Sequence, residues 1–258
     1  MVDSILYEKS GHVAIITMNR PEALNAITVE MIEAFSRALS AAKADDVRVL
    51  ILTGAGRAFC VGADLKQLKL WQHNADLRAR FSNHAPAMFR QLLEFNRPII
   101  AAVNGVAAAG GFELCCVADL VIAAEDALIG DAHANFVGFG PVSAALAATV
   151  LPAKLAAELL LTGDMWPARK LALAGFVNHL VPQESVMAVA REIATKIASK
   201  QPLALAVAKS LMRRAHRVDS QVLLPEAFER AQHIFDTKDF AEGVAAFEEK
   251  RTPRFEGR

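Results

Sequence analysis

The sequence carries no net charge. Lys plus Arg number 28 and Asp plus Glu also number 28 among 258 residues. A neutral chain has no general electrostatic attraction to nucleic acid or to an anionic membrane surface, so we expect neither as a partner. The basic run KSLMRRAHR (209–217) is better explained as the solvated face of a helix. Any phosphate group on a substrate must therefore be bound by a few local Lys or Arg side chains.

Targeting and membrane-spanning segments are also lacking. The first residues, MVDSILYEKSGHVAIITMNRP, show neither a basic segment followed by a long apolar one nor an Arg- and Ser-rich transit composition. The most apolar runs, such as PIIAAVNGVAAAGG, contain polar and glycine breaks and are too short to span a bilayer. We expect a cytoplasmic protein.

Cysteine is too scarce for a disulfide framework. Cys60, Cys115 and Cys116 are the three cysteines, and adjacent cysteines rarely pair with each other. No CxxC or HExxH motif is present, so we predict no metal site. We interpret the three cysteines as small buried hydrophobic residues.

Three common motifs of nucleotide and serine chemistry are incomplete. The segment GAGRAF (54–59) follows an apolar run, but Phe59 occupies the position of the third glycine of a dinucleotide-binding loop. It also lacks the GK[ST] of a P-loop. The nearest approach to a nucleophile elbow, GFGPVSAA (138–145), lacks the flanking glycines. We therefore expect no permanently bound cofactor and no serine hydrolase.

The first two thirds of the chain alternate strand and helix patterns. The runs at 12–18, 47–53 and 98–103 are rich in β-branched residues and almost continuously apolar, as is typical of strands buried on both faces. Residues 28–43 repeat apolar side chains at helical spacing, with Thr28 as the expected N-cap. Strand–helix–strand order predicts parallel pairing in an α/β fold.

Only helical patterns follow from about residue 184. They cover 184–199, 202–217, 225–236 and 238–251, and Pro202 and Pro225 stand where helices should begin. We divide the chain into a core at 1–198 and a C-terminal helical region at 199–258. A helical appendage with one apolar face often packs on a neighbouring subunit.

Two loops rich in small residues can approach a ligand with their backbone. FCVGADLK (59–66) follows a strand, and the sequence NGVAAAGGFEL (104–114) follows another and opens a helix that ends near Ala118. Paired glycines leave N–H groups uncovered at a helix N-terminus, where the macrodipole favours negative charge. Such an amide can bind an oxygen that becomes negative during a reaction. Close helix–strand packing is the alternative explanation of the glycine pair.

Taken together, these segments resemble the crotonase (enoyl-CoA hydratase/isomerase) superfamily. MNRPEALNAI (18–27), AFCVGADLK (58–66), the segment through Glu113, DLVIAAEDALIG (119–130) and AFEEKR (246–251) occur in the family's order and approximate spacing. The resemblance implies an α/β fold built as a spiral of ββα turns, with a C-terminal helical trimerisation region. It also implies a homotrimer or homohexamer.

The resemblance implies an acyl-CoA substrate, with coenzyme A bound as part of that substrate. The backbone amides of Ala63 and Gly110 are implied to form an oxyanion hole for the thioester carbonyl. The residues implied to contact the substrate are Ala63, Asp64, Leu65, Lys66, Gly110 and Lys250.

Hydratases of this family use two glutamates, one that activates water and one that exchanges a proton with the α-carbon. Glu113 matches the first, whereas His133 occupies the position of the second, and the following stretch VGFGPVSAA also departs from the family pattern. The expected activity is reversible hydration of a 2-enoyl-CoA. Other reactions of the superfamily, such as isomerisation, decarboxylation or thioester hydrolysis, and non-catalytic acyl-CoA binding remain as alternatives.

Three interpretations of His133 stay open. It replaces the second carboxylate as acid or base, since an imidazole titrates near neutral pH. It binds substrate while Glu113 alone transfers protons. Or it is a hydrogen-bonded histidine without a catalytic role. Asp131 contributes to the site only if its loop turns the side chain inward, and we expect it instead to be a solvated turn residue.

Overall fold

The computed structural model describes residues 3–70, 73–136, 138–215, 237–249 and 251–258. The strands are β1 (Ile5–Ser10), β2 (Val13–Met18), β3 (Val49–Gly54), β4 (Ala58–Cys60), β5 (Ile99–Val103), β6 (Val106–Ala108), β7 (Leu120–Ala124), β8 (Leu128–Gly130), β9 (Trp166–Pro167) and β10 (His179–Val181). The α-helices are α1 (Val29–Ala44), α2 (Leu65–Leu70), α3 (Ala75–Leu93), α4 (Gly110–Val117), α5 (Pro141–Val150), α6 (Ala153–Thr162), α7 (Ala168–Leu173), α8 (Val186–Ala198), α9 (Pro202–Ala215) and α11 (Lys238–Glu248). Short 3₁₀ turns are η1 (Pro21–Ala23), η2 (Ala132–Asn135) and η3 (Gln183–Ser185).

The strands form two sheets, and from β3 to β8 consecutive strands of the chain alternate between them. The larger sheet has the order β1-β2-β3-β5-β7-β10 and the smaller one β4-β6-β8-β9. The pairs β3 and β4, β5 and β6, and β7 and β8 each give one strand to each sheet, and helices follow each pair. Successive turns pair in parallel with the previous one in both sheets. The predicted spiral of ββα turns is therefore confirmed.

The strands predicted at 12–18, 47–53 and 98–103 and the helix predicted at 28–43 are confirmed to within two residues. The helix predicted at 28–43 is α1, and the Thr28 hydroxyl accepts a hydrogen bond from the Met31 amide at its N-terminus. This helix connects β2 to β3, which pair in parallel as expected. Every residue of β3 and β5 is buried, which explains why these strands lack polar alternation.

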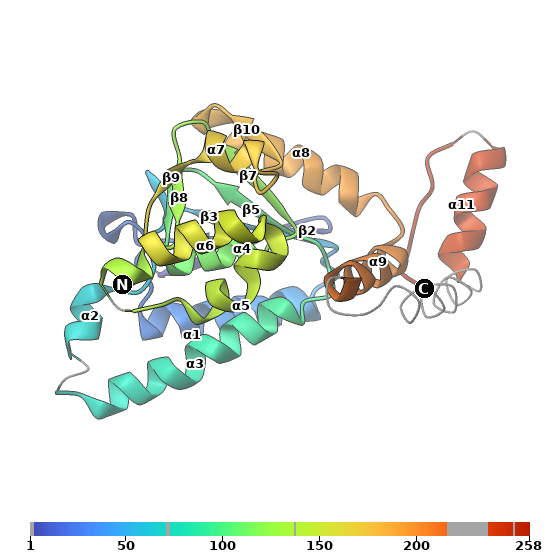
Figure 1. Cartoon of the computed structure of the whole chain (residues 1–258). Helices are drawn as coiled ribbons and strands as arrows, with labels where there is room; N and C mark the ends of the chain where they lie inside the picture. The colour runs from blue at the N-terminus through green and yellow to red at the C-terminus, as the bar shows by residue number, and fades with distance from the viewer. Residues whose placement is uncertain (1–2, 71–72, 137, 216–236, 250) are drawn as a thin grey trace.

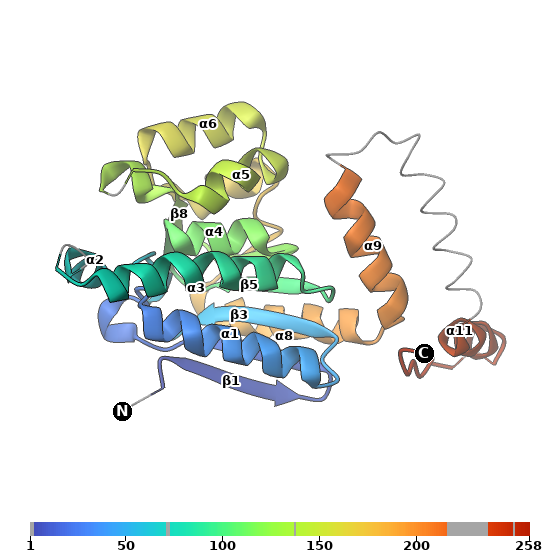
Figure 2. The same cartoon turned by 90° about the horizontal axis from the view of Figure 1, so that it is seen from below.

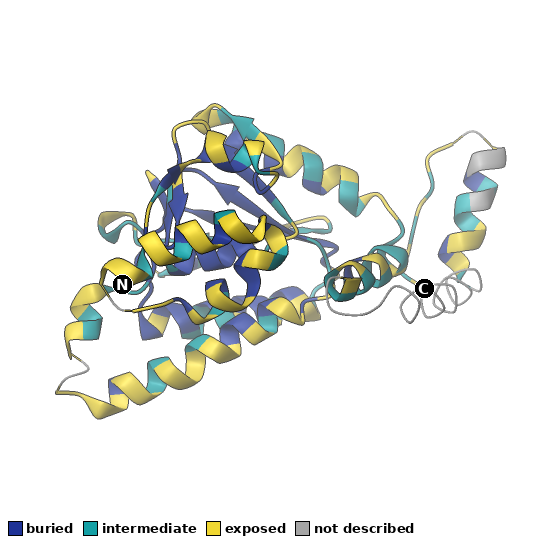
Figure 3. Ribbon diagram, in the orientation of Figure 1, coloured by how far each residue is buried: buried dark blue, intermediate teal, exposed yellow. Residues whose placement is uncertain are grey.

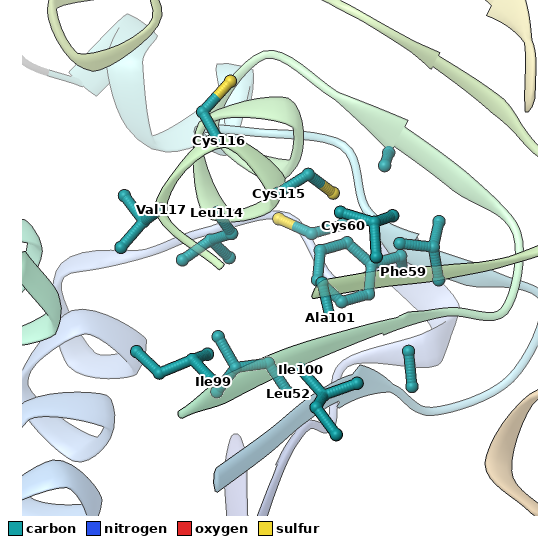
Figure 4. Close-up of a cluster of buried hydrophobic side chains, with 14 of the residues drawn as sticks. Leu52, Phe59, Cys60, Ile99, Ile100, Ala101, Leu114, Cys115, Cys116 and Val117 are labelled. Atoms are coloured by element: carbon teal, nitrogen blue, oxygen red, sulfur yellow. The ribbon is translucent and has the colours of Figure 1, made fainter. Parts of the chain in front are cut away.

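The core lies between the larger sheet and the helices that cover it. Figure 1 shows α8 on one side of this sheet and α1 and α3 on the other. Buried residues concentrate on the strands and on the inner faces of the helices, whereas the outer faces of α3, α5 and α6 are exposed (Figure 3). Figure 4 shows α4 packed above the strands, with Cys60 and Cys115 between them. All three cysteines are free and buried, as predicted.

The C-terminal helices extend away from this core. Figures 1 and 2 show α9 beside the core and α11 beyond it. The boundary predicted at residue 199 falls in the link between α8 and α9, and α9 begins at Pro202 as expected. The helix predicted at 225–236 lies outside the described residues. Among the residues that the structure describes, no helix is long and apolar enough to cross a bilayer.

A charged cluster fixes α9 on the core. Asp119, at the start of the segment that enters β7, pairs with Lys209 at 2.7 Å and with Arg213 at 3.3 Å. Lys209 is buried, so the expectation that the basic run 209–217 is a solvated helix face is wrong at this residue, and it also donates to the backbone oxygen of Arg97 at 2.6 Å. The carboxylate of Asp119 also accepts from the Ile99 amide at 2.8 Å, so it joins α9 to the larger sheet.

Arg213 extends the same cluster to the ends of two helices. Its guanidinium donates to the backbone oxygens of Leu93 at 2.7 Å and Val117 at 2.8 Å. These are the final residues of α3 and α4, where a cation stabilises unpaired carbonyl groups. The helix that opens at Gly110 is thus held at its far end by α9.

We expect the substitution Asp119→Asn to destabilise the protein. Removing one partner of a buried ion pair costs roughly 3–5 kcal/mol, and the partial exposure of Asp119 reduces this to about 2–3 kcal/mol. The melting temperature should fall by roughly 5–10 °C in thermal denaturation. The matched variant is Asp126→Asn, which changes an exposed aspartate a few residues away and should leave the melting temperature unchanged. Equal stability of the two variants would contradict this role of Asp119.

Candidate active site

The first small-residue loop presents an unpaired amide at Ala63. Ala63 forms an isolated parallel bridge with Ile27. The Ile27 amide donates to the Gly62 oxygen at 2.7 Å, and the Asp64 amide donates to the Ile27 oxygen at 2.9 Å. In such a bridge the N–H of the middle residue points away from its neighbour. Within the described part of the chain, the Ala63 amide donates no hydrogen bond.

The second loop presents another unpaired amide, at the first residue of α4. Ala109 precedes this helix with φ +50° and ψ −114°, a conformation that L residues other than glycine rarely adopt. Its own amide donates to the Gly130 oxygen at 3.1 Å, and its oxygen accepts from the Glu113 amide at 3.0 Å. These bonds hold the strained turn. The Gly110 amide has no acceptor among the described residues.

The two loops lie against each other at glycines. Gly62 has φ +85°, and a Cβ atom there would lie 2.7 Å from the Cβ of Ala109 and 3.1 Å from the Gly110 nitrogen. A larger residue at position 62 would therefore separate the two loops. The amides of Ala63 and Gly110 therefore belong to neighbouring backbone segments, and their role as a pair of donors stays a prediction.

Two buried asparagines fix the strand that leads into the first loop. Asn25, with φ +59°, donates to the oxygens of Ala55 at 3.0 Å and Ala58 at 2.8 Å. Asn104 donates to the Gly56 oxygen at 2.8 Å and accepts from the Gly54 amide at 3.3 Å. Asn25 of MNRPEALNAI and Asn104 of NGVAAAGG thus have structural roles.

The remaining predicted contact residues divide between structural and exposed positions. Asp64 accepts from the Lys66 and Gln67 amides at the start of α2, at 3.0 and 3.3 Å, and pairs with Arg20 at 3.0 Å. Leu65 and Lys66 are exposed beside it. The binding roles of Asp64, Leu65 and Lys66 stay predictions, and Lys250 lies outside the described residues.

Glu113 is a buried carboxylate in the first turn of α4. Its side chain is 4% exposed, and Oε1 accepts from the amides of Val142 at 2.9 Å and Ser143 at 3.2 Å. Those amides belong to the first turn of α5, where the helix dipole favours a negative charge. Burial nevertheless raises the pKa of Glu113 above 4.5, against the charge of His133 and the two hydrogen bonds. A raised pKa suits a carboxyl group that accepts and returns protons.

The buried Asp131 and the half-buried His133 form a pair that acts on Glu113. Nδ1 of His133 is hydrogen bonded to Oδ1 of Asp131, and the Ser143 hydroxyl donates to Oδ2 of Asp131 at 2.5 Å. Asp131 is 2% exposed, so the expectation of a solvated turn residue is wrong. The turn η2 directs this side chain inward, where it caps its own turn by accepting from the His133 amide at 3.2 Å.

Burial and charge act in opposite directions on this pair. Burial lowers the pKa of His133, but the hydrogen bond and charge of Asp131 and the charge of Glu113 outweigh it, so that the pKa lies above 6.5. Burial raises the pKa of Asp131, but the bonds from His133 and Ser143 bring it below 3.8. Asp131 is therefore a carboxylate, and His133 is stabilised as an imidazolium.

Sequence reasoning missed the contribution of α5. Ser143 lies in the segment dismissed as a nucleophile elbow, and no pattern connects it with Glu113, thirty positions earlier. The available signal was Gly140-Pro141, which predicts a helix N-terminus with free amides. In the described part of the chain, no group of three or more His, Cys, Asp or Glu side chains is arranged to hold a metal ion.

Two interleaved sheets, a helix that opens at an unpaired amide and a buried glutamate in its first turn together define a protein of the crotonase fold. A family model described as enoyl-CoA hydratase/isomerase matches residues 8–258. The chain belongs to this enoyl-CoA hydratase/isomerase family.

Named relatives match over almost the full length. The 2,3-dehydroadipyl-CoA hydratase of Escherichia coli (strain K12) is 32% identical over 260 residues, covering 100% of both chains. The probable mitochondrial enoyl-CoA hydratase of Dictyostelium discoideum is 36% identical and covers 95% of this chain and 88% of its own. The crystal structure of enoyl-CoA hydratase from Bacillus anthracis matches with a TM-score of 0.92 at 32% identity, over 99% of this chain and 100% of that one.

Proposed function

We propose that this protein catalyses the reversible hydration of a 2-enoyl-CoA thioester. The observation that carries the proposal is the position of Glu113, a buried carboxylate one turn after the unpaired Gly110 amide of the same helix. Family membership and the names of the relatives support an acyl-CoA substrate. Coenzyme A enters and leaves as part of that substrate, and the predicted assembly is a homotrimer or homohexamer.

In this proposal the amides of Ala63 and Gly110 bind the thioester oxygen. When water adds to the β-carbon, the electrons of the double bond move toward the carbonyl and the oxygen gains negative charge. Fixed N–H donors stabilise this charge, and the loss of one such donor costs about 2.7–4 kcal/mol of transition-state stabilisation. The N-terminus of α4 adds a favourable dipole.

The hydration needs two proton transfers, one to a base and one from an acid. Glu113 takes a proton from the attacking water while the water oxygen bonds to the β-carbon. The α-carbon then takes a proton from an acid, for which we propose His133, and the enolate returns to a thioester. The carboxylate of Glu113 and the imidazolium of His133 thus supply the same two functions as a carboxylate and a carboxylic acid. The reverse sequence of steps eliminates water.

The test is a panel of acyl-CoA thioesters incubated with the protein and followed by mass spectrometry. Hydration of crotonyl-CoA or a longer 2-enoyl-CoA is expected as a mass gain of one water molecule. Loss of carbon dioxide or release of free coenzyme A would instead identify a decarboxylase or a thioester hydrolase. An isomerase would move the double bond without a change of mass, detectable by chromatography. Thermal stabilisation by every thioester without turnover of any would overturn the proposal in favour of an acyl-CoA binder.

A further inference from the structure

Of the two buried carboxylates of the site, Asp131 and Glu113, Asp131 accepts more hydrogen bonds. One oxygen, Oδ1, accepts from the backbone amide of His133 and is bonded to its Nδ1 atom. The other, Oδ2, accepts from the Ser143 hydroxyl. With both oxygens occupied and the side chain buried, the carboxylate cannot turn away from the imidazole.

Ser143 links this pair to Glu113. Its hydroxyl is bonded to Asp131, and its amide donates to Glu113 at 3.2 Å. The hydroxyl also lies 3.0 Å from the Gly140 oxygen, but the charged carboxylate is the stronger acceptor for its single proton. The first turn of α5 therefore holds two carboxylates in a fixed relation.

The bond to Asp131 determines which nitrogen of His133 exchanges protons. A carboxylate accepts, so Nδ1 must carry hydrogen in both the charged and the neutral imidazole. The second nitrogen, Nε2, makes no hydrogen bond within the described part of the chain. It is therefore the nitrogen that loses and regains a proton.

We infer that Asp131 is a positioning residue that fixes His133 in the Nδ1–H form and keeps it ready to donate a proton from Nε2. Asp131 touches no reacting atom in this scheme and acts through the imidazole. The kinetic consequence rests on the proposed function, whereas the protonation state of His133 does not. The local sequence does not predict this pairing, because it depends on the inward turn of Asp131 at η2 and on Ser143 from α5.

The competing explanation is that Asp131 only caps the turn η2. A residue that only caps the turn bonds to the backbone amide and does not decide which nitrogen of the imidazole carries hydrogen. The charged groups that act on His133 are Asp131, at the end of β8, and Glu113, on α4. The helix α5 contributes the uncharged Ser143, and α6 meets η2 through the bond from Asn135 to the Gly163 oxygen. The nitrogen that carries hydrogen in neutral His133 therefore separates the two explanations.

The sign of the pH effect follows from these charges. The productive enzyme has Glu113 deprotonated and His133 protonated, so activity rises with pH through the pKa of Glu113 and falls through that of His133. The negative charge of Asp131 favours the imidazolium. The isosteric variant Asp131→Asn should move the falling limb of kcat/KM to lower pH and lower kcat by about 10–100-fold, less than the 10²–10⁴-fold of losing an acid–base group.

The direct test is long-range ¹H–¹⁵N NMR of the imidazole groups in the full-length protein. The chain has 7 histidines, and His133→Gln assigns the signal of interest. We expect a pKa above that of a free histidine and, at high pH, a neutral form with hydrogen on Nδ1. In Asp131→Asn the pKa should fall, whereas in Asp126→Asn, which changes an exposed residue, it should not move.

Two results would overturn the inference. One is the finding that neutral His133 in the wild-type protein carries hydrogen on Nε2. This measurement does not depend on whether any variant folds. The other is an Asp131→Asn protein with unchanged His133 pKa and an unchanged pH profile. If no thioester is turned over but the NMR results are as expected, the proposed function fails while the Asp131–His133 pairing stands.

Discussion

Replacing Glu113 by glutamine is expected to lower kcat for a 2-enoyl-CoA by about 10²–10⁴-fold, the usual contribution of a positioned acid–base group. The amide oxygen of glutamine still accepts from the Val142 and Ser143 amides, so the packing of α4 against α5 is preserved. An amide cannot take a proton from water at neutral pH. The loss should therefore appear in kcat, with KM and the melting temperature close to those of the wild type.

A matched control is Glu125→Gln, which removes an exposed carboxylate at the end of β7. It changes the formal charge by the same amount and should retain full activity. Steady-state kinetics with crotonyl-CoA, together with circular dichroism, distinguish loss of chemistry from loss of structure. Full activity of Glu113→Gln would exclude Glu113 as the base and leave His133 as the only titratable candidate of the predicted pair.

Local patterns predicted those parts of the fold that depend on short segments. The strands β2, β3 and β5 were predicted because strands buried on both faces are almost continuously apolar. The helix α1 was visible from its spacing and its cap. The apolar run of a strand and the spacing and N-cap of a helix can each be recognised within one short segment of the sequence.

Strands of two or three residues gave no comparable signal. β4, β6, β8 and β9 have at most three residues each, and their pairing depends on the spiral that brings distant segments together. The family resemblance supplied this arrangement, and periodicity did not. The helix α3 was also missed, and it continues through Pro86, a residue that normally argues against a helix interior.

In the candidate site, too, some features were predicted from sequence motifs, whereas others depend on contacts between distant segments. Glu113 and the two amides were predicted because they lie on motifs that the family resemblance covers. The inward position of Asp131 was not, because it depends on the Ser143 hydroxyl from another helix. Whether a polar side chain faces water or the interior is decided by the partners that the fold supplies, and these are invisible in a local sequence window.

The variant Gly111→Ala is expected to destabilise the protein far more than Gly110→Ala, although the glycines are adjacent. A Cβ atom on Gly111 would lie closer than 3.0 Å to the backbone oxygen and carbon of Cys60, which cannot move without shifting β4. On Gly110 the nearest atoms are the flexible end of Ile27 at 3.0 Å and the Gly62 Cα at 3.4 Å. Overpacking against backbone costs about 1–3 kcal/mol and occasionally more, and the loss for Gly111→Ala should reach or exceed the upper end.

This pair of variants separates the two explanations of the glycines. Gly111 permits close packing of α4 on β4, whereas Gly110 borders the thioester oxygen only in the proposed function. Chemical denaturation should therefore show a large loss of stability for Gly111→Ala only. Gly110→Ala should fold, since alanine favours a helix over glycine by about 1 kcal/mol, but its methyl group should obstruct substrate and lower kcat/KM. A stable Gly111→Ala protein would show that α4 does not need this close approach, and a fully active Gly110→Ala protein would show that the substrate does not bind beside Gly110.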